Sequence, residues 1–164
     1  MLDSQTPKGK IYIEHQDTVR DWLASYGHTV MDVSHGSFPF DLIVSKDGQE
    51  VSSFVEVKCR EFAGDKVIDL DYIKENGYLI TLDKILENTK YSKMFGVPFI
   101  IVVKLIHSGE LLVWKVTDSS GEVIIPYTTR ETSTQKSCNG GVANRVNAFL
   151  SINDAMYVRK PEER

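Results

Sequence analysis

The segment FDLIVSKDGQEVSSFVEVKCR, residues 40–60, constrains the fold of this chain more than any other part of its sequence. It holds two apolar runs, FDLIV and FVEVK, on either side of a short polar stretch that contains Asp-Gly. Asp-Gly between two such runs is a strong signal for a tight hairpin turn. The segment is therefore predicted to form two antiparallel strands, Phe40–Ser45 and Val51–Arg60.

Charged residues interrupt both apolar runs. Asp41 lies in the first run, and Glu56 and Lys58 lie in the second. An unpaired charge buried in a strand costs several kcal/mol, or its pKa shifts until the group is neutral. Since side chains alternate between the faces of a strand, Glu56 and Lys58 point the same way, and the hairpin brings Asp41 beside them. We therefore expect the three groups to lie together.

Two carboxylates and one ammonium group at one place suit a divalent metal ion. Mg²⁺ binds through a few carboxylate oxygens, keeps several waters and takes other ligands from substrate phosphate. A bound cation activates water and offsets phosphate charge, while a lysine orients the water or stabilises developing charge. With two acids and one lysine, we expect an acidic pocket that repels phosphate without its metal. A structural salt-bridge cluster, or an edge strand with solvated charges, is the alternative.

The composition is that of an ordinary globular protein. The length of 164 residues predicts one domain over residues 1–164. The net charge of −4 excludes a basic nucleic-acid coat, so any contact with DNA or RNA must use a local patch or metal ions. Cys59 and Cys138 match no zinc pattern and are expected to be free thiols.

No segment predicts a signal peptide or a membrane span. The first ten residues hold no apolar stretch. The longest apolar run, Phe99–Ile106, is too short to cross a bilayer and contains Lys104. We therefore predict a cytoplasmic protein with no membrane partner.

The periodicity of the chain predicts an α/β (α+β) fold with the order α-β-β-β-α-β-β. Apolar residues at helical spacing mark a first helix, and Thr81 is the expected N-cap of a second. The expected elements are a helix at 11–26, strands at 28–33, 40–45 and 51–60, a helix at 81–96, strands at 99–106 and 111–117, and a last strand at 146–152 followed by a short turn of helix. Residues 61–79 are expected to be irregular, and 118–145 to be a loop or extended edge.

This order predicts a mixed central sheet flanked by helices. The connection from Arg60 to Phe99 runs through a helix, which suits a right-handed crossover between parallel neighbouring strands.

The pattern Pro39-Phe40-Asp41, a hairpin, then Glu56-Val57-Lys58 resembles the PD-(D/E)XK nuclease superfamily, which has the restriction-endonuclease-like fold. The strand FVEVKCR looks like the E-[VI]-K-x-R strand of Holliday-junction-resolvase-like and phage-type members. The resemblance covers roughly residues 11–117. It implies that Asp41 and Glu56 are metal ligands, that the backbone carbonyl of Val57 is a further ligand, and that Lys58 is the catalytic lysine.

Two further family positions fall on the predicted helices. Many relatives carry a glutamate on the first helix, where this chain has Gln16 with Glu14 nearby, so the number of metal ions stays open. Relatives also place a lysine or glutamine on the helix after the E-x-K strand, and Lys84 is the best match. The alternative for Lys84 is a solvated residue of the first helical turn.

The resemblance implies a Mg²⁺- or Mn²⁺-dependent nuclease that hydrolyses DNA, most simply an endonuclease. A catalytically inactive nuclease-like domain that binds nucleic acid or a protein partner is the alternative. The sequence leaves open whether the protein acts as a homodimer.

Two surfaces are candidates for contact with nucleic acid. Tyrosines and lysines surround the second predicted helix, where they could stack on bases and contact phosphate; they are Tyr72, Tyr78, Tyr91, Lys74, Lys90 and Lys93. The segment 128–145, with Arg130, Lys136 and Arg145, could close on a substrate. An ordinary charged helix surface and a flexible loop are the respective alternatives.

Overall fold

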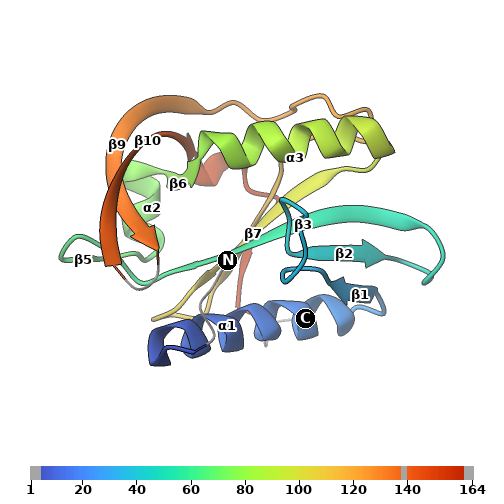
Figure 1. The fold of residues 1–164 in the computed structure, drawn as a ribbon, viewed down its shortest axis with the longest axis horizontal. Coiled ribbons are helices and arrows are strands. Elements are labelled where there is room, and N and C mark those ends of the chain that lie inside the picture. The colour runs from blue at the N-terminus through green and yellow to red at the C-terminus, as the bar shows by residue number, and fades with distance from the viewer. Residues whose placement is uncertain (1–4, 138–139, 161–164) are drawn as a thin grey trace.

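The computed structural model describes residues 5–137 and 140–160 of the chain, and its elements are labelled in Figure 1. In chain order the elements are α1 (Pro7–Ala24), β1 (Thr29–Asp32), β2 (Leu42–Ser45), β3 (Val51–Arg60), β4 (Phe62–Ala63), β5 (Lys66–Val67), α2 (Leu70–Asn76), β6 (Tyr78–Thr81), α3 (Leu82–Phe95), β7 (Phe99–Leu105), β8 (Leu111–Lys115), β9 (Thr128–Ser137), β10 (Gly140–Leu150), the 3₁₀ helix η1 (Ile152–Asp154) and β11 (Tyr157–Arg159).

A mixed sheet of six strands forms the centre of the fold, in the order β1-β2-β3-β7-β8-β11. β3 and β7 pair in parallel, and the other neighbours pair antiparallel. The predicted mixed sheet and the parallel pair joined through a helical connection are therefore confirmed. The register places Glu56 beside Ile101 and Lys58 beside Val103, so both charged residues stand among apolar neighbours from β7.

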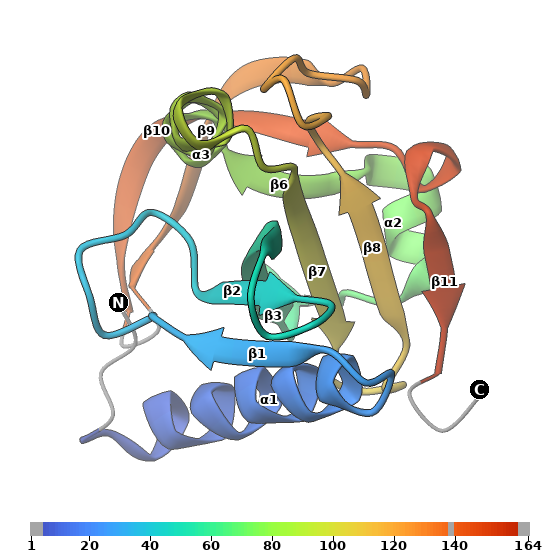
Figure 2. The same cartoon turned by 90° about the vertical axis from the view of Figure 1, so that its right-hand side faces the viewer.

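Helices cover the two faces of this sheet, with α1 on one side and α3 on the other (Figures 1 and 2). Val19 and Trp22 of α1 belong to an apolar cluster that includes Val55 and Val57 of β3. Ile85 of α3 belongs to a second cluster on the opposite face. Because side chains alternate along β3, Glu56 and Lys58 point toward the α3 side.

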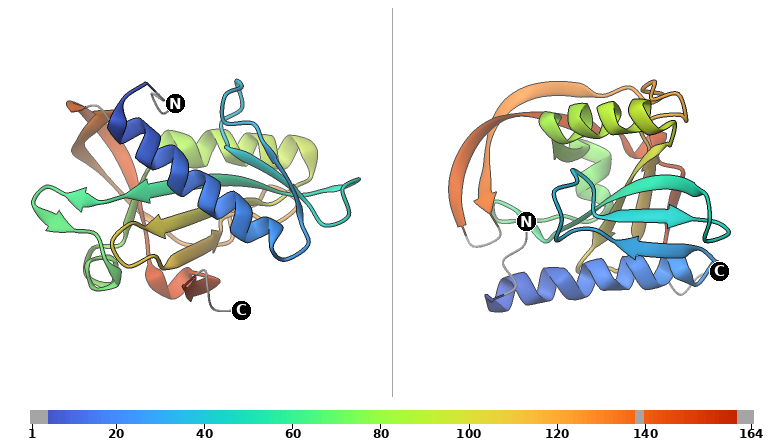
Figure 3. Two further views of the ribbon diagram at one scale, coloured as in Figure 1. Left: turned by 90° about the horizontal axis from the view of Figure 1, so that it is seen from below. Right: turned by 45° about the vertical axis from the view of Figure 1, so that its right-hand side comes forward.

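A second sheet, β6-β10-β9, lies on the α3 side and bends around one end of the molecule (Figure 3). The expectation of a loop or extended edge over residues 118–145 fits β9, which is an edge strand of this sheet, whereas the first part of β10, paired with it as a regular strand, was not expected. The segment TTRETSTQKS of β9 is polar on both faces, so it lacks the apolar alternation by which a strand is recognised. The expected strand at 146–152 is the C-terminal half of β10, and the short helical turn after it is η1.

Residues 61–79 are also more regular than expected. They hold the small β4–β5 hairpin, α2 and the start of β6. The side chain of Asp69 caps α2 by accepting a hydrogen bond of 2.8 Å from the backbone N–H of Tyr72. These elements were missed because each is too short to show a period. β11, near the end of the described chain, was missed for the same reason.

The boundaries of the long helices follow local capping. α1 begins earlier than expected because Thr6 accepts a hydrogen bond of 3.0 Å from Gly9 N–H and Pro7 occupies the first turn. It ends at Ala24 with Ser25 as C-cap, before the expected stop at Gly27. α3 begins after Thr81 and ends at Gly96, which has a φ of 66°, as predicted.

Two further expectations concern the cysteines and membranes. Cys59 is a free thiol whose pKa burial raises to about 12. Cys138 lies outside the described residues. None of the helices in the described part of the chain has the length and apolar character needed to span a bilayer.

The packing of α3 against the loop after β8 generates a test of stability. Gly121 has a φ of 83°, and a Cβ there would lie 2.5 Å from the Cα of Lys93. Gly121→Ala is therefore expected to lower the free energy of unfolding by about 2–5 kcal/mol, from backbone strain together with overpacking. The measurement is urea denaturation.

The matched control for this variant is Gly109→Ala. Gly109 has a similar φ of 76°, but a Cβ there meets nothing within 4 Å. Its loss should be limited to the backbone strain, about 1–2 kcal/mol. Equal losses in the two variants would contradict the close approach of Lys93 to Gly121.

Candidate active site

Asp41 lies directly before β2, not inside it. Its N–H donates to the carbonyl of Val55 at 2.9 Å, and its own carbonyl accepts from Val33 N–H at 2.8 Å. The β2–β3 register pairs Leu42 with Val55, and one further step places Asp41 opposite Glu56. Asp41, Glu56 and Lys58 therefore share one face of the sheet, as the sequence predicted.

The carboxylate of Asp41 replaces a backbone acceptor just before β2 begins. Its Oδ2 accepts a hydrogen bond of 2.8 Å from the backbone N–H of Val57. The N–H and C=O groups of a strand residue point toward the same neighbouring strand. The carbonyl of Val57 therefore points to the Asp41 side of β3. An ion bound by the Asp41 carboxylate can contact this carbonyl as well.

Aromatic packing fixes the chain just before Asp41. Phe40 is 2% exposed, and its ring stacks on that of Phe54 with 4.2 Å between centroids. Tyr91 of α3 packs edge-on against the same ring at 5.7 Å. The Pro39-Phe40 pair thus anchors the start of β2 between β3 and α3.

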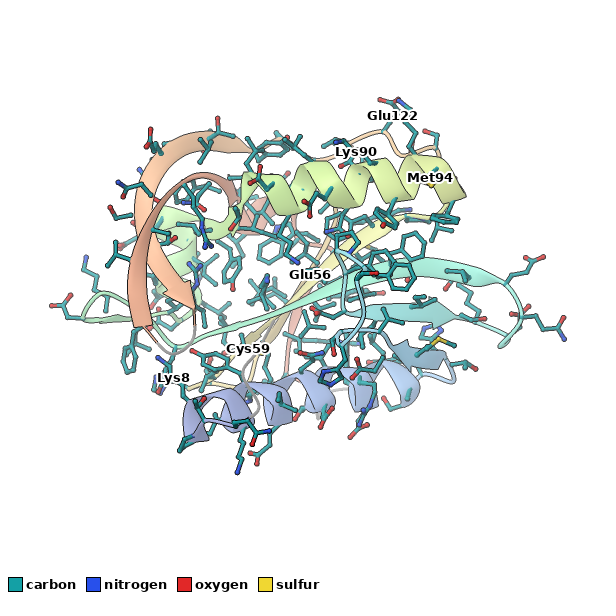
Figure 4. The ribbon with its side chains drawn as sticks, in the orientation of Figure 1. Lys8, Glu56, Cys59, Lys90, Met94 and Glu122 are labelled. Carbon is teal, nitrogen blue, oxygen red and sulfur yellow. The ribbon has the colours of Figure 1, made fainter. Side chains whose placement is uncertain are left out.

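Glu56 is the most deeply buried charged group of the site, with 1% of its side chain exposed. Its Oε1 lies 2.6 Å from the Nζ of Lys58 and 3.4 Å from the Nζ of Lys84. Its Oε2 is buried without a hydrogen-bond partner among the described residues. Figure 4 shows Glu56 in the space between β3 and α3. A buried carboxylate oxygen without a donor is an unfavourable arrangement unless another group completes it.

Lys84 reaches this site from the first turn of α3. Its Nζ donates to the carbonyl of Pro39 at 3.0 Å as well as pairing with Glu56. It is therefore not simply a solvated residue. The buried side of α3 is partly polar, because Asn88 and Ser92 are buried together with Ile85 while Leu86 is 46% exposed.

Asn88 is a site residue that the sequence analysis missed. Its Nδ2 donates to Pro39 at 3.2 Å and to the carbonyl of Lys84 at 2.8 Å. The available signal was spacing, since Lys84, Asn88 and Ser92 recur every four residues and so share one stripe of the helix. Polar residues in that stripe satisfy buried backbone groups at the edge of the site.

The site perturbs the pKa of Asp41. Burial raises this pKa, the nearby Glu56 raises it further, and the favourable contacts with Lys58, Val57 N–H and Lys84 offset only part of the shift, leaving it at about 6. Burial acts in the opposite direction on Lys58, but the attraction of Glu56 and Asp41 outweighs it, so the pKa of Lys58 is raised. Lys58 therefore keeps its proton at neutral pH.

The charges of the site are balanced, which corrects the expectation of an acidic pocket. Asp41 and Glu56 face two lysines, because Lys84 joins Lys58. The expectation counted only Lys58 against the two acids, because the sequence left open whether Lys84 was a site residue or a solvated residue of the first helical turn.

The donor set fits a divalent cation that brings most of its own ligands. No group of three or more His, Cys, Asp or Glu residues able to hold a metal occurs in the described residues. Mg²⁺ in phosphoryl-transfer sites is commonly held by only one or two carboxylates with waters and substrate phosphate. The unpartnered Oε2 of Glu56, the raised pKa of Asp41 and the Val57 carbonyl are consistent with such a site.

Gln16 and Glu14 do not join this group. Both lie on α1, which covers the opposite face of the sheet. No hydrogen bond or ion pair connects either side chain with Asp41 or Glu56 within residues 5–137 and 140–160. The aromatic and basic surface expected around α3 is also divided, because Tyr91 packs on Phe40 while Lys93 pairs with Glu122 at 3.6 Å.

Comparison with known families agrees with this arrangement. Residues 12–149 match the family described as "Phage putative PDDEXK endonuclease". The chain belongs to this family. The resemblance to PD-(D/E)XK nucleases is thereby confirmed, and the mixed sheet with its flanking helices is the restriction-endonuclease-like fold of the superfamily. PDDEXK nucleases typically use divalent metal ions. No curated protein and no solved structure gives a significant match.

The pKa of Asp41 generates a test that needs no activity. Because about 6 in the folded chain exceeds about 3.9 in the unfolded chain, folding takes up a proton between these pH values. The free energy of unfolding should therefore fall by about 2–3 kcal/mol as the pH rises from 4 to 7.

Asp41→Asn keeps an oxygen that can accept from Val57 N–H but removes this titration. In EDTA, the variant should be more stable than the wild type at pH 7 and similar to it at pH 4, as measured by urea denaturation across this range. Parallel pH profiles for the two proteins would contradict the burial of a titrating Asp41.

Proposed function

We propose that this chain is a metal-dependent nuclease that hydrolyses phosphodiester bonds of DNA as an endonuclease, with the whole chain acting as one nuclease domain. The observation that carries the proposal is the pairing of Asp41 with a buried Glu56 that has an unpartnered Oε2, beside Lys58, in a chain of the PDDEXK endonuclease family. A cytoplasmic location stays a prediction, and action as a homodimer stays open.

The carboxylates of Asp41 and Glu56 and the carbonyl of Val57 would hold the metal ion, Mg²⁺ or Mn²⁺. When bound, such a cation supplies a Lewis acid that lowers the pKa of water and offsets negative charge on phosphate oxygens.

Lys58 acts as a hydrogen-bond donor and a positive charge. The attraction of Glu56 and Asp41 raises its pKa, which favours the protonated ammonium in this arrangement. With 36% of its side chain exposed, it remains accessible to a substrate entering beside Glu56. It orients the attacking water and stabilises charge that develops on the phosphate oxygens.

Lys84 has a supporting role in the same site. It bridges Glu56 and the carbonyl of Pro39, so it holds the Glu56 carboxylate and the start of β2 at a fixed distance from α3. Its remaining exposed surface places a second positive charge near the position of a bound phosphate.

The alternative is a nuclease-like domain that binds nucleic acid or a protein partner without cutting. Glu56 forms ion pairs with Lys58 and Lys84. If these pairs only stabilise the fold, they favour this alternative. The retention of all three motif residues favours the enzyme, since inactive relatives usually lose one of them.

The first test of the proposal is cleavage. The wild type is expected to cut DNA with Mg²⁺ or Mn²⁺, assayed on both plasmid and single-stranded DNA, and to lose this activity in EDTA. Lys58→Ala should lower the cleavage rate by about 10²–10³, the usual effect of removing one charge-stabilising donor. Lys46→Ala, in the exposed turn before β3, is the matched control and should stay within about twofold, as expected for a residue far from the reacting atoms. Cleavage that does not need Lys58 or a metal would overturn the assignment.

The second test separates a metal ligand from a structural ion pair. If Glu56 is a ligand, Glu56→Gln should keep the fold, abolish cleavage and lose the Mg²⁺-dependent rise in Tm seen in the wild type. Asp41 still compensates the two lysines, each of which is 36% exposed, so the loss of stability should be small.

If Glu56 is instead a structural partner, the same change should lower the free energy of unfolding by about 3–5 kcal/mol. The wild type should then show no shift with Mg²⁺, and the binding-domain alternative would stand. Thermal melts with and without Mg²⁺ decide between these outcomes, with Glu50→Gln in the exposed β2–β3 turn as control.

A further inference from the structure

A cleft of about 580 Å³ opens beyond the C-terminal end of β3. It is lined by the start of α1, the end of β3, the β4–β5 hairpin, α2, β6, and the β9 and β10 strands. Figures 1 and 3 show these segments gathered at one end of the molecule, and Lys8 is labelled at this end in Figure 4. The volume lies within the range of about 300–1,000 Å³ found for sites that enclose small ligands.

The lining of the cleft is positively charged, in contrast with the whole chain. Lys8, Arg60 and Arg130 line it against one acid, Glu61. In the described part of the molecule none of these three cations takes part in an ion pair, whereas Glu61 lies 3.4 Å from His107. The cations are therefore available to an anionic ligand such as a phosphate group.

Aromatic rings alternate with these cations. The guanidinium of Arg130 lies over the ring of Phe149 at 4.2 Å from its centroid, and that of Arg60 lies 6.0 Å from the centroid of Tyr78. Tyr72 lines the same cleft. Tyr78 is 3% exposed, so its ring supports the Arg60 guanidinium and offers no face to a ligand. The half-buried Tyr72 and the guanidinium groups are the flat surfaces on which unpaired bases can stack while their phosphates are bound.

The cleft lies farther along β3 on the face that carries the candidate active site, and Arg60 is the residue of β3 that lines it. Glu56, Lys58 and Arg60 are alternate residues of β3 and therefore point to the same face. Arg60 lies four residues beyond Glu56, about 13 Å at about 3.3 Å per residue. This distance equals the length of about four stacked nucleotides at about 3.4 Å each.

We propose that this cleft holds an unpaired nucleic-acid segment whose backbone runs along β3 from Arg60 to the scissile phosphate at Glu56 and Lys58. The inference rests on the proposed nuclease function and names its substrate class, which is a strand with an unpaired segment within about four nucleotides of the cut. A fully paired duplex does not fit this role, because its stacked bases present no free faces to the aromatic side chains.

The test measures binding without cleavage. Asp41→Asn is used as the background, in EDTA, with fluorescent 12-nucleotide single strands of DNA and of RNA and with a blunt DNA duplex. Adding Arg60→Gln and Arg130→Gln together should weaken single-strand binding at least tenfold. It should also reduce the slope of log affinity against log salt by about 1.4, the value expected for two lost phosphate contacts. Comparing the DNA and RNA strands identifies which of them supplies the segment.

A stacking variant makes the test independent of charge. Tyr72→Leu should weaken single-strand binding at least about fivefold, and Tyr72→Phe should restore it, because stacking needs the ring and not the hydroxyl. The charge-matched control is Lys46→Gln with Lys160→Gln, two exposed lysines outside the cleft. It should change neither the single-strand affinity beyond twofold nor the effect of Tyr72→Leu.

The two proposals fail in different ways. Unchanged single-strand affinity in the cleft variants, or an equal loss for the blunt duplex, overturns the cleft while cleavage by the wild type stands. Metal-dependent cleavage that is absent from the wild type, with single-strand binding that still depends on Arg60 and Arg130, overturns the nuclease function and leaves a single-strand binding site. Circular dichroism of each variant checks that a loss of binding does not come from unfolding.

Discussion

The carboxylate of Glu56 is the constraint on which the arrangement of this molecule depends. A charge with 1% exposure in the middle of a strand needs cations close by, and the chain supplies them from two elements. Lys58 comes from β3 itself, and Lys84 comes from the first turn of α3. The second contact fixes where α3 lies, because the helix must begin directly over the strand that carries the acid.

The residues just before β2 serve the same site. The side chain of Asp41, not a backbone carbonyl, accepts the hydrogen bond from Val57 N–H. Before it, the carbonyl of Pro39 is bound by Lys84 and Asn88 and is therefore directed toward the helix. At this point the side chain of Asp41 thus takes the place of a backbone acceptor, which brings its carboxylate to the same face of the sheet as Glu56.

Much of the site could be predicted from the sequence because it depends on short-range rules. The two-residue period of a strand places Glu56 and Lys58 on one face, and the Asp-Gly turn brings Asp41 alongside. Lys84 could be named as a candidate only from the family resemblance. The sequence does not show that Lys84 faces the sheet unless one knows that the polar residue Asn88, one turn later, is buried. The balance of charge in the site depends on the contact of Lys84 with Glu56, which the sequence did not predict.

The second sheet could not be predicted by the same rules. β9 is polar on both faces, and its pairing with β10 depends on a long-range register that no local pattern encodes. β6 pairs with the other side of β10, so it too gains its structure from a segment almost seventy residues away in the sequence. The cleft beside the active site is built mainly from these elements and was therefore absent from the sequence-based expectations.

The junction of β6 and α3 has a consequence for how this protein can change during evolution. Thr81 is the last residue of the strand and Leu82 the first of the helix, so no loop separates them. Each residue added or removed there would turn the following helix by about 100° and shift it by about 1.5 Å. Lys84 would then leave Glu56, and the polar stripe would rotate out of the interior. Changes in length are therefore tolerable in the turns at hairpin ends, but at this junction the number of residues is as restricted as the identity of a catalytic side chain.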